Sequence, residues 1–243
     1  MARIFITGSA DGLGHLAAKS LVSQGHQVVL HARNRKRGED ALKKVPDAED
    51  VLTGNLADME ETKMLAEKVN ALGHFDTVIH NAGVYRESYE LIFKVNTLAP
   101  YILTCLIQKP KRLVYLSSGS HMSGNPNLKS IETGGVSYGD SKLHDVILSF
   151  AVARKWPDVH SNAVDPGWVP TKMGGRGAPG NLQKGYETQV WLAVSDDAEA
   201  KVSGHYFYHK RQKYFVPEAA DSDVQEKFLN LCELATGVRF PAE

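Results

Sequence analysis

The chain is short of cysteine, of net charge and of long hydrophobic runs. Its 243 residues include two cysteines, Cys105 and Cys232, which predict neither a disulfide framework nor a cysteine-ligated metal site. The 28 Lys+Arg residues balance the 28 Asp+Glu residues. A nucleic-acid binder needs a basic field to contact phosphates, so that class is disfavoured. No stretch resembles a membrane span or a signal peptide, which predicts a cytoplasmic protein.

What the sequence does contain is an alternation of short apolar runs with longer segments of helical pattern. The apolar runs are continuous, as is typical of strands that are covered on both faces. The expected strands are residues 3–7, 27–31, 50–53, 75–80, 112–117, 159–164 and 205–208. The expected helices are residues 13–24, 36–45, 58–72, 87–108, 136–156, 184–195 and 221–234. This order predicts an α/β fold with a doubly wound, mostly parallel, seven-stranded sheet between two helical layers.

Residues 1–243 are expected to form a single domain, because no linker or internal repeat interrupts the alternation. Two connections are unusually long, Gly119–Gly135 and Gly167–Gln183. Both follow strands and should lie at the carboxyl edge of the sheet, where ligands bind in open α/β folds. The segment at about 167–183 is rich in glycine and is predicted to be a substrate loop that orders on binding.

The first expected strand runs into a glycine-rich turn and then into a helix. The turn reads Thr7-Gly8-Ser9-Ala10-Asp11-Gly12-Leu13-Gly14. Glycines allow a tight turn and a close backbone approach to a pyrophosphate, and the helix N-terminus supplies N–H donors. A tight turn alone would also favour glycine, but the strand before it and the helix after it favour a dinucleotide-binding site.

The end of the second expected strand distinguishes the two common dinucleotides. NAD sites place an acidic residue here to bind the ribose 2′-hydroxyl, but this chain has no carboxylate before Glu39. Arg33 can instead hold a 2′-phosphate with its fork of donors. The sequence therefore predicts NADP(H) rather than NAD(H), with Arg33 at the phosphate and Arg37 in solvent at the start of a helix.

A tyrosine and a lysine, Tyr138 and Lys142, lie four residues apart on an expected helix, so they share one face. A nearby ammonium favours the phenolate and makes a tyrosine a better acid–base group at neutral pH. The pair Ser117 and Ser118 ends a strand, where a hydroxyl can hydrogen-bond a substrate oxygen. Asn96 lies in an apolar helix, and a buried amide there must be hydrogen-bonded.

In this order the motifs closely resemble those of the short-chain dehydrogenase/reductase family, in its compact single-domain branch. The long connection before Tyr138 resembles that of members similar to retinol dehydrogenase and protochlorophyllide reductase. The matching motifs are Thr7–Gly14, Asn81–Gly83, Asn96, Ser117–Ser118, Tyr138 with Lys142, and Pro166-Gly167 with Thr171. The resemblance implies a Rossmann-type fold that binds NAD(P)(H). The chain departs from the family at Asn55, where aspartate is usual, and at His80, where asparagine is commoner.

The resemblance also implies a role for each matching residue. Tyr138 would be the general acid in carbonyl reduction and the general base in alcohol oxidation, while Lys142 would assist it and bind the nicotinamide ribose. Ser118 would orient the substrate oxygen, and Asn96 would hold a water in a proton relay toward Lys142. The residues implied at the cofactor are Thr7, Gly8, Ser9, Asp11, Gly12, Leu13, Gly14, Arg33, Asn55, Leu56, Asn81, Ala82, Gly83, Tyr138, Lys142, Pro166, Gly167, Val169 and Thr171.

The predicted function is NADP(H)-dependent hydride transfer to or from a carbonyl or alcohol group of a small, mostly apolar molecule. No metal and no nucleic-acid partner is expected, and a homo-oligomer, dimeric or tetrameric, is left open. One alternative is an NADP(H)-binding sensor or regulatory protein without turnover, which the full set of four catalytic residues disfavours. The other is a nucleotide-sugar epimerase or dehydratase, for which little chain remains after residue 171.

Overall fold

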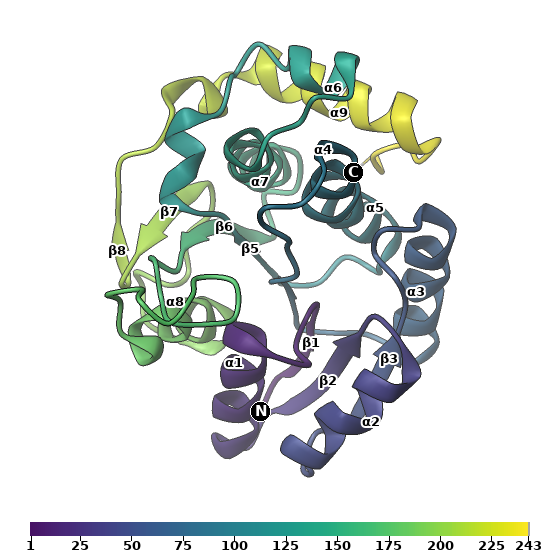
Figure 1. Cartoon of the computed structure of the whole chain (residues 1–243), viewed down its shortest axis with the longest axis vertical. Coiled ribbons are helices and arrows are strands. Elements are labelled where there is room, and N and C mark those ends of the chain that lie inside the picture. Colours follow the sequence, from purple (N-terminus) through teal and green to yellow (C-terminus); the bar gives the residue numbers. More distant parts are fainter. Residues whose placement is uncertain (243) are drawn as a thin grey trace.

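The computed structural model of the chain describes residues 1–242, which form one sheet between two layers of helices (Figure 1). The strands are β1 (Arg3–Ile6), β2 (Gln27–Ala32), β3 (Asp50–Thr53), β4 (Thr77–His80), β5 (Arg112–Leu116), β6 (His160–Asp165), β7 (His205–Tyr208) and β8 (Arg211–Gln212). Their order across the sheet is β3-β2-β1-β4-β5-β6-β7-β8. Every neighbouring pair is parallel except β7 and β8.

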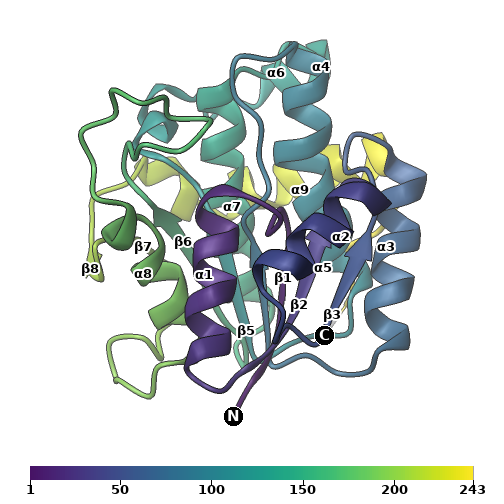
Figure 2. The ribbon, with the colours of Figure 1, turned by 60° about the horizontal axis from the view of Figure 1, so that its bottom comes forward.

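The helices divide between the two faces of this sheet. They are α1 (Gly12–Ser23), α2 (Arg35–Lys44), α3 (Met59–Ala71), α4 (Tyr89–Ile92), the π-helix η1 (Phe93–Leu98), α5 (Ala99–Leu106), the 3₁₀ helix η2 (Gly119–Ser123), α6 (Lys129–Thr133), α7 (Tyr138–Lys155), α8 (Leu182–Val194), the 3₁₀ helix η3 (Pro217–Ala220) and α9 (Ser222–Thr236). Helices α1 and α2 lie in front of the sheet in Figure 2, on the same side as α8, and α3, α5 and α7 lie behind it.

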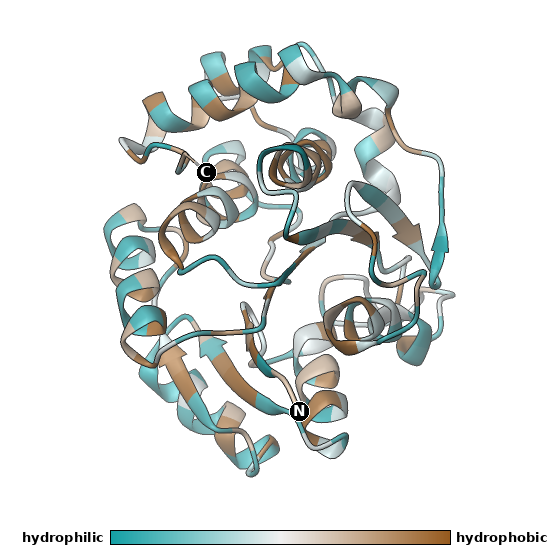
Figure 3. Ribbon diagram, turned by 180° about the vertical axis from the view of Figure 1, so that it is seen from behind, coloured by the Kyte–Doolittle hydropathy of each residue, from teal (hydrophilic) through white to brown (hydrophobic). Residues whose placement is uncertain are grey.

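Each face of the sheet has its own hydrophobic core. Along β1, Ile4 and Ile6 join the cluster beneath α1, α2 and α8, whereas Phe5 joins the cluster beneath α3, α5 and α7. Successive side chains of a strand point to opposite faces, so a strand buried on both sides must be apolar throughout. Figure 3 shows this pattern, with hydrophobic residues on the strands and hydrophilic ones on the outer helices. The predicted α/β class with a mostly parallel sheet is confirmed.

The structure differs from the expected elements in three places. The sheet has an eighth strand, β8, which is too short to leave a pattern in the sequence. The helix expected at 87–108 is divided into α4, η1 and α5. Pro100 has no N–H, and in an α-helix its ring would clash with the carbonyl of Asn96, which accounts for the wider turn of η1. The connection 119–135 contains η2 and α6, each of only five residues.

The C-terminal helix α9 covers the outer side of α7 (Figure 1). The chain after α9 is tied down as well, because the Tyr101 hydroxyl donates to the main-chain oxygen of Val238 at 2.8 Å. Among residues 1–242, no helix combines the length and the apolar character that crossing a membrane requires.

The strand order places a ligand crevice at a defined position. Strand β1 pairs with β2 on one side and with β4 on the other, so the chain reverses its direction across the sheet at β1. In open α/β sheets, ligands bind outside the carboxyl ends of the strands at such a reversal. The glycine-rich turn, Asn81–Gly83, Ser117–Ser118 and the segment after β6 all begin at this edge.

Candidate active site

A cavity of about 480 Å³ opens at the carboxyl edge of the sheet, a size typical of ligand sites. Residues between Gly8 and Met173 line it, because the ends of β1, β2, β3, β4, β5 and β6 converge there. The predicted site residues in its wall are Gly8, Asp11, Gly12, Leu13, Arg33, Asn55, Leu56, Asn81, Ala82, Gly83, Tyr138, Lys142, Pro166 and Thr171. The structure therefore brings together most of the residues that the sequence singled out.

Seven predicted residues do not line the cavity but pack behind or beside its wall: Thr7, Ser9, Gly14, Asn96, Ser118, Gly167 and Val169. The Thr7 hydroxyl accepts hydrogen bonds from the main-chain N–H groups of Asn81 and Ala82, both at 3.0 Å. The Asn81 amide donates to the main-chain oxygen of Thr7 at 2.9 Å. These contacts tie the end of β1 to the end of β4, so Thr7 shapes the glycine-rich turn from behind.

The glycine-rich turn approaches its neighbours so closely that side chains are excluded. Gly8 has a φ of +64°, and a Cβ there would lie 2.8 Å from the Cα of Ala82. A Cβ on Gly14 would lie 2.3 Å from Nδ2 of Asn81. The residues present thus form a bare-backbone cradle at the N-terminus of α1, which is what a pyrophosphate requires.

His31 supports this cradle and was not predicted to belong to the site. Its Nδ1 accepts the N–H of Gly8 at 2.9 Å, and its Nε2 lies 2.9 Å from the main-chain oxygen of Gly54. These partners fix the tautomer, with the proton on Nε2. Burial lowers the pKa of His31 to about 4, so the ring is neutral and remains an acceptor for Gly8. The only sequence signal for this supporting role was the position of a histidine at the end of an apolar strand.

Three cations gather where the adenosine side of a dinucleotide would lie. Arg33 is exposed on the cavity rim and pairs with no carboxylate among residues 1–242. Arg37 also lines the cavity, with Nη2 3.6 Å from Oδ2 of Asp11, so it is not the purely solvated residue that the sequence predicted. Lys172, from the segment after β6, pairs with the same carboxylate. Its hydrogen bond is the main cause that holds the pKa of Asp11 below its usual range.

The tyrosine and the lysine meet at the floor of the cavity. Tyr138 is the first residue of α7, and a capping box between Ser137 and Asp140 fixes the start of that helix. The Lys142 ammonium lies 5.7 Å from the centroid of the Tyr138 ring. It is buried and donates hydrogen bonds to the main-chain oxygen of Leu116 and to Oδ2 of Asp145, both at 2.8 Å.

The two serines after β5 differ in whether their hydroxyl protons already have an acceptor in the protein. The Ser117 hydroxyl lines the cavity but donates to the main-chain oxygen of Lys142 at 2.7 Å. The Ser118 hydroxyl accepts the N–H of Ser120 at 3.1 Å and has no acceptor among residues 1–242. Its proton is therefore available to a ligand oxygen.

Asn96 is 1% exposed, and protein groups occupy its amide. Its Oδ1 accepts the N–H of Val84 at 2.8 Å, and its Nδ2 donates to the main-chain oxygen of Val84 at 3.0 Å and to the Ser141 hydroxyl at 3.1 Å. Asn96 thus joins the segment after β4 to α7. A Cβ on Gly83 would lie 3.4 Å from Asn96 Oδ1 and 3.6 Å from the Lys142 ammonium, so glycine allows these groups to meet.

His80, whose presence the sequence left without interpretation, packs beneath the site. Its Nε2 lies 3.2 Å from the Thr104 hydroxyl, and its ring stacks on Tyr115 with 4.8 Å between centroids. Burial lowers the pKa of His80 to about 3, which keeps the ring neutral. It therefore acts as a packing residue of the core rather than as a charged member of the site.

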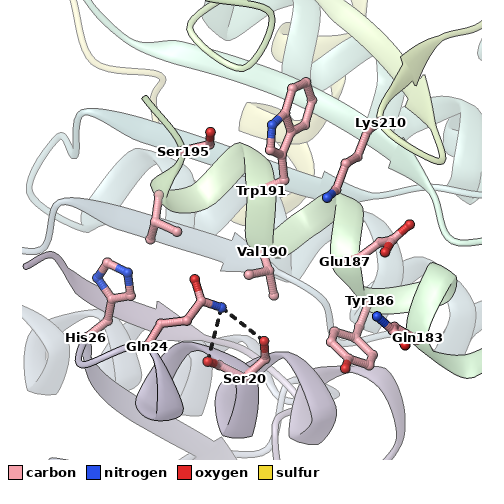
Figure 4. A pocket seen from close by; sticks show the side chains of 11 residues that line it. Ser20, Gln24, His26, Gln183, Tyr186, Glu187, Val190, Trp191, Ser195 and Lys210 are labelled. Atoms are coloured by element: carbon pink, nitrogen blue, oxygen red, sulfur yellow. Dashed lines mark hydrogen bonds between the residues drawn. The ribbon is translucent and has the colours of Figure 1, made fainter. Parts of the chain in front are cut away.

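A second cavity, of about 400 Å³, lies between α1 and α8 (Figure 4). Val190 of α8 points toward Ser20 of α1 and Gln24 just after that helix, and the Gln24 amide donates to the main-chain and hydroxyl oxygens of Ser20. This cavity contains none of the predicted site residues. The larger cavity at the strand ends, which most of the predicted residues line, is therefore the candidate active site.

Comparison with known proteins agrees with this geometry. Residues 2–179 match the family model described as short chain dehydrogenase. An uncharacterized oxidoreductase from Emericella nidulans is 46% identical over 99% of both chains. Retinol dehydrogenase 14 from Mus musculus is 26% identical over 97% of this chain and 86% of its own. A putative uncharacterized protein from Mycobacterium paratuberculosis has the same fold, with a TM-score of 0.82, 22% identity and coverage of 99% of this chain and 95% of that chain.

The family match spans most of the chain, and the first relative is similar throughout. The likeness to retinol dehydrogenase is that of a distant homologue. The residues of the cavity also suit the nicotinamide dinucleotide that this family implies, because the backbone cradle and the cations match its phosphates. The chain belongs to the short-chain dehydrogenase/reductase family and is an oxidoreductase of that type.

Proposed function

We propose that the protein is an NADP(H)-dependent oxidoreductase that interconverts a carbonyl and an alcohol on a small, mostly apolar molecule. The observation that carries the proposal is the meeting of Tyr138 and Lys142 at the floor of a cavity whose other end is the glycine cradle. The cofactor supplies hydride chemistry, and the protein supplies binding, orientation and the proton.

Tyr138 is the acid–base group of this proposal. In carbonyl reduction the phenol gives its proton to the substrate oxygen as the carbon is reduced, and in alcohol oxidation the phenolate takes that proton back. The Lys142 ammonium favours the phenolate through its positive charge and has one N–H left to bind a ribose hydroxyl. Tyr85 packs edge-on against Tyr138, with 4.7 Å between ring centroids, and limits the movement of the phenol.

Ser118 orients the substrate oxygen in this proposal. Its hydroxyl proton has no acceptor among the described residues, whereas that of Ser117 is already committed to Lys142. A donor placed where negative charge develops lowers the barrier to the reaction. Asn96 holds Val84 and Ser141 in place through its side chain. Because Pro100 has no N–H, the main-chain oxygen of Asn96 lacks its usual α-helical donor, and we propose that it holds the water of a proton relay toward Lys142.

The preference for NADP(H) rests on charge at the end of β2. Arg33 on the cavity rim is free to form a bidentate contact with a 2′-phosphate, and no acidic residue stands beside it to bind a 2′-hydroxyl instead. Arg37 adds a second cation in the same wall, although Asp11 partly neutralises it.

A mostly apolar substrate is proposed from the residues near Tyr138. Val84, Leu91 and Val95 line the cavity and belong to the same hydrophobic cluster as Tyr138, and Met173 also lines the cavity. These side chains offer hydrophobic contact but few hydrogen-bonding groups, so they suit a hydrocarbon body carrying one reactive oxygen. Met173 comes from the segment at 167–183, which is therefore proposed to be the substrate loop.

The experiment is turnover with a panel of aldehydes and ketones. Purified protein and NADPH are mixed with each compound, and the loss of nicotinamide absorbance is followed for wild type and for Tyr138→Phe. We expect turnover of apolar carbonyl compounds by the wild type and a loss of at least about a hundredfold in the variant. Binding of NADPH without turnover of any compound, in both proteins alike, would instead indicate a sensor.

A further inference from the structure

Asp145 lies close to the lysine of the site, one helical turn beyond it on α7. Its carboxylate Oδ2 accepts a hydrogen bond from the Lys142 ammonium at 2.8 Å. Both members of the ion pair are almost fully buried, with side-chain exposures of 6% for Lys142 and 4% for Asp145. A buried charge that loses its partner is strongly disfavoured, so each of these side chains depends on the other.

The contacts of the ammonium restrict where it can act. A lysine ammonium has three N–H donors and no acceptor. The main-chain oxygen of Leu116 takes one donor and Asp145 takes another, which leaves a single donor for a ligand. The direction of that last donor is therefore set by two fixed contacts, of which only Asp145 carries a charge.

We propose that Asp145 is a positioning residue for the catalytic pair: it anchors the Lys142 ammonium, balances its charge and thereby sets the pH range in which Tyr138 exchanges protons with a substrate. The inference rests on the proposed carbonyl–alcohol chemistry and deepens it. An ammonium without a counter-charge favours a nearby phenolate more strongly than an ion pair of zero net charge does. The Asp145 carboxylate therefore offsets part of the positive charge that Lys142 presents to Tyr138.

The ion pair itself is charged at neutral pH. Burial raises the pKa of the Asp145 carboxyl to about 6, although Lys142 opposes this rise. Burial disfavours the charged form of Lys142, but Asp145 and Tyr138 together raise the pKa of the lysine above its usual value.

Several buried ionisable groups on the elements around α7 have pKa values that burial shifts toward the neutral form. They are Tyr115 on β5 and Cys232 on α9, whose pKa values burial raises, Cys105 on α5, whose pKa burial raises to about 12, and three histidines whose pKa values burial lowers: His80 on β4, to about 3, His144 on α7, to about 4, and His121 on η2. None of them therefore supplies a negative charge in place of Asp145. Two further buried carboxylates have partners of their own: Asp140 on α7 accepts from Ser137 and Asn125, and Asp165 at the end of β6 accepts from Gly167 and pairs with Lys213.

The test is the pH profile of alcohol oxidation with NADP⁺, measured for wild type, Asp145→Asn and Asp145→Glu. The substrate is the alcohol that corresponds to the best carbonyl compound of the panel. Asp76→Asn is the matched control, because Asp76 also pairs with a lysine at 2.9 Å but lies at the opposite edge of the sheet. NADPH affinity is measured for each variant by fluorescence titration.

In Asp145→Asn, we expect the acid limb of kcat/KM to move to lower pH by about half a unit or more. The reason is that no negative charge then offsets the Lys142 ammonium, which attracts the phenolate of Tyr138 more strongly. Asp145→Glu restores the charge and should leave the limb in place, with kcat reduced at least about fivefold at unchanged KM. The control should match the wild type in both respects. NADPH affinity should stay within about threefold in every variant.

An acid limb that coincides in Asp145→Asn and the wild type, or that moves equally in the Asn and Glu variants, would overturn the inference while leaving the proposed function intact. A wild type that binds NADPH but turns over no substrate overturns the proposed function itself. If Asp145→Asn does not fold, Asp145→Glu decides the matter, because a kcat equal to that of the wild type shows that the position of this carboxylate does not determine how the lysine acts.

Discussion

Arg33 and Arg37 follow the same strand but have different partners. Arg33 lies on the cavity rim without an ion-pair partner among the described residues, whereas Arg37 interacts with Asp11. A free guanidinium is available to a phosphate, but one that already faces a carboxylate gains less from a second anion. Discrimination between NADP(H) and NAD(H) should therefore reside mainly in Arg33.

Replacing Arg33 with alanine should weaken NADPH binding by roughly ten- to a hundredfold, because a charge-assisted contact contributes about 1.5–3 kcal/mol. NADH lacks the 2′-phosphate, so its affinity should change by less than about threefold. Both dissociation constants are measured by fluorescence titration. Arg35→Ala is the matched control, because Arg35 is an exposed neighbour that pairs with Glu39. Equal weakening of the two cofactors in Arg33→Ala would show that Arg33 does not bind the 2′-phosphate.

At the scale of elements, the turn between β1 and α1 is built from backbone contact. Gly8 has a positive φ and leaves no room for a Cβ against Ala82. Gly25, in the turn after α1, also has a positive φ, of +83°, but a Cβ there would meet nothing within 4 Å. An alanine at Gly25 would therefore cause backbone strain alone, whereas an alanine at Gly8 would cause strain and also a steric clash inside the cradle.

Gly8→Ala should lower NADPH affinity by at least about tenfold and reduce stability by about 1–3 kcal/mol, because both strain and a clash with backbone follow. Gly25→Ala should cost about 1 kcal/mol from strain alone and leave cofactor affinity unchanged. Affinity is measured by titration and stability by urea unfolding. If the two variants bind NADPH equally well, the turn at Gly8 does not form the phosphate cradle.

The same elements show what a sequence can predict. The glycine-rich turn and the Tyr138–Lys142 pair were predictable because they depend on neighbours within one turn or one helix. The interruption at η1 was not, because Pro100 alone does not say whether a helix ends, kinks or widens. His31 acts through a contact with Gly8 that only the packing of the elements creates. Asp145 pairs with Lys142 three residues earlier on the same helix, so the spacing was visible in the sequence, but the burial that makes this pair matter was not.

At the scale of the whole molecule, burial of three histidines links folding to pH. Burial lowers the pKa of His31 and of His144 to about 4 and that of His80 to about 3. Their ordinary pKa is about 6.5, so between that value and about 4 the unfolded chain binds protons that the folded chain does not. Stability from these residues is present above about pH 6.5 and is lost as the pH falls.

The free energy of unfolding should therefore decrease as the pH is lowered from about 6.5 to 4, by up to about 1.4 kcal/mol per pH unit for each histidine. Asp145 works in the opposite direction, since its raised pKa favours the folded state at low pH, but one carboxyl is outweighed by three imidazoles. Urea unfolding at several pH values measures the slope. Stability that stays level or rises across this range would show that these histidines are accessible to protons in the folded protein.

The cavity extends from the glycine cradle to Tyr138 and Lys142. In the proposed reaction, the same substrate receives a hydride from the cofactor and a proton from Tyr138 in this one cavity. Deuterium at both positions of C4 of NADPH marks the hydride whichever face transfers it, and its appearance in the product alcohol can be followed by mass spectrometry in a single turnover.

Wild-type protein should place deuterium on the former carbonyl carbon of an apolar ketone. Tyr138→Phe should bind the same NADPH within about threefold but transfer deuterium at least about a hundredfold more slowly, because the proton donor is missing. Equal rates of transfer in the two proteins, or product alcohol without deuterium, would contradict the account.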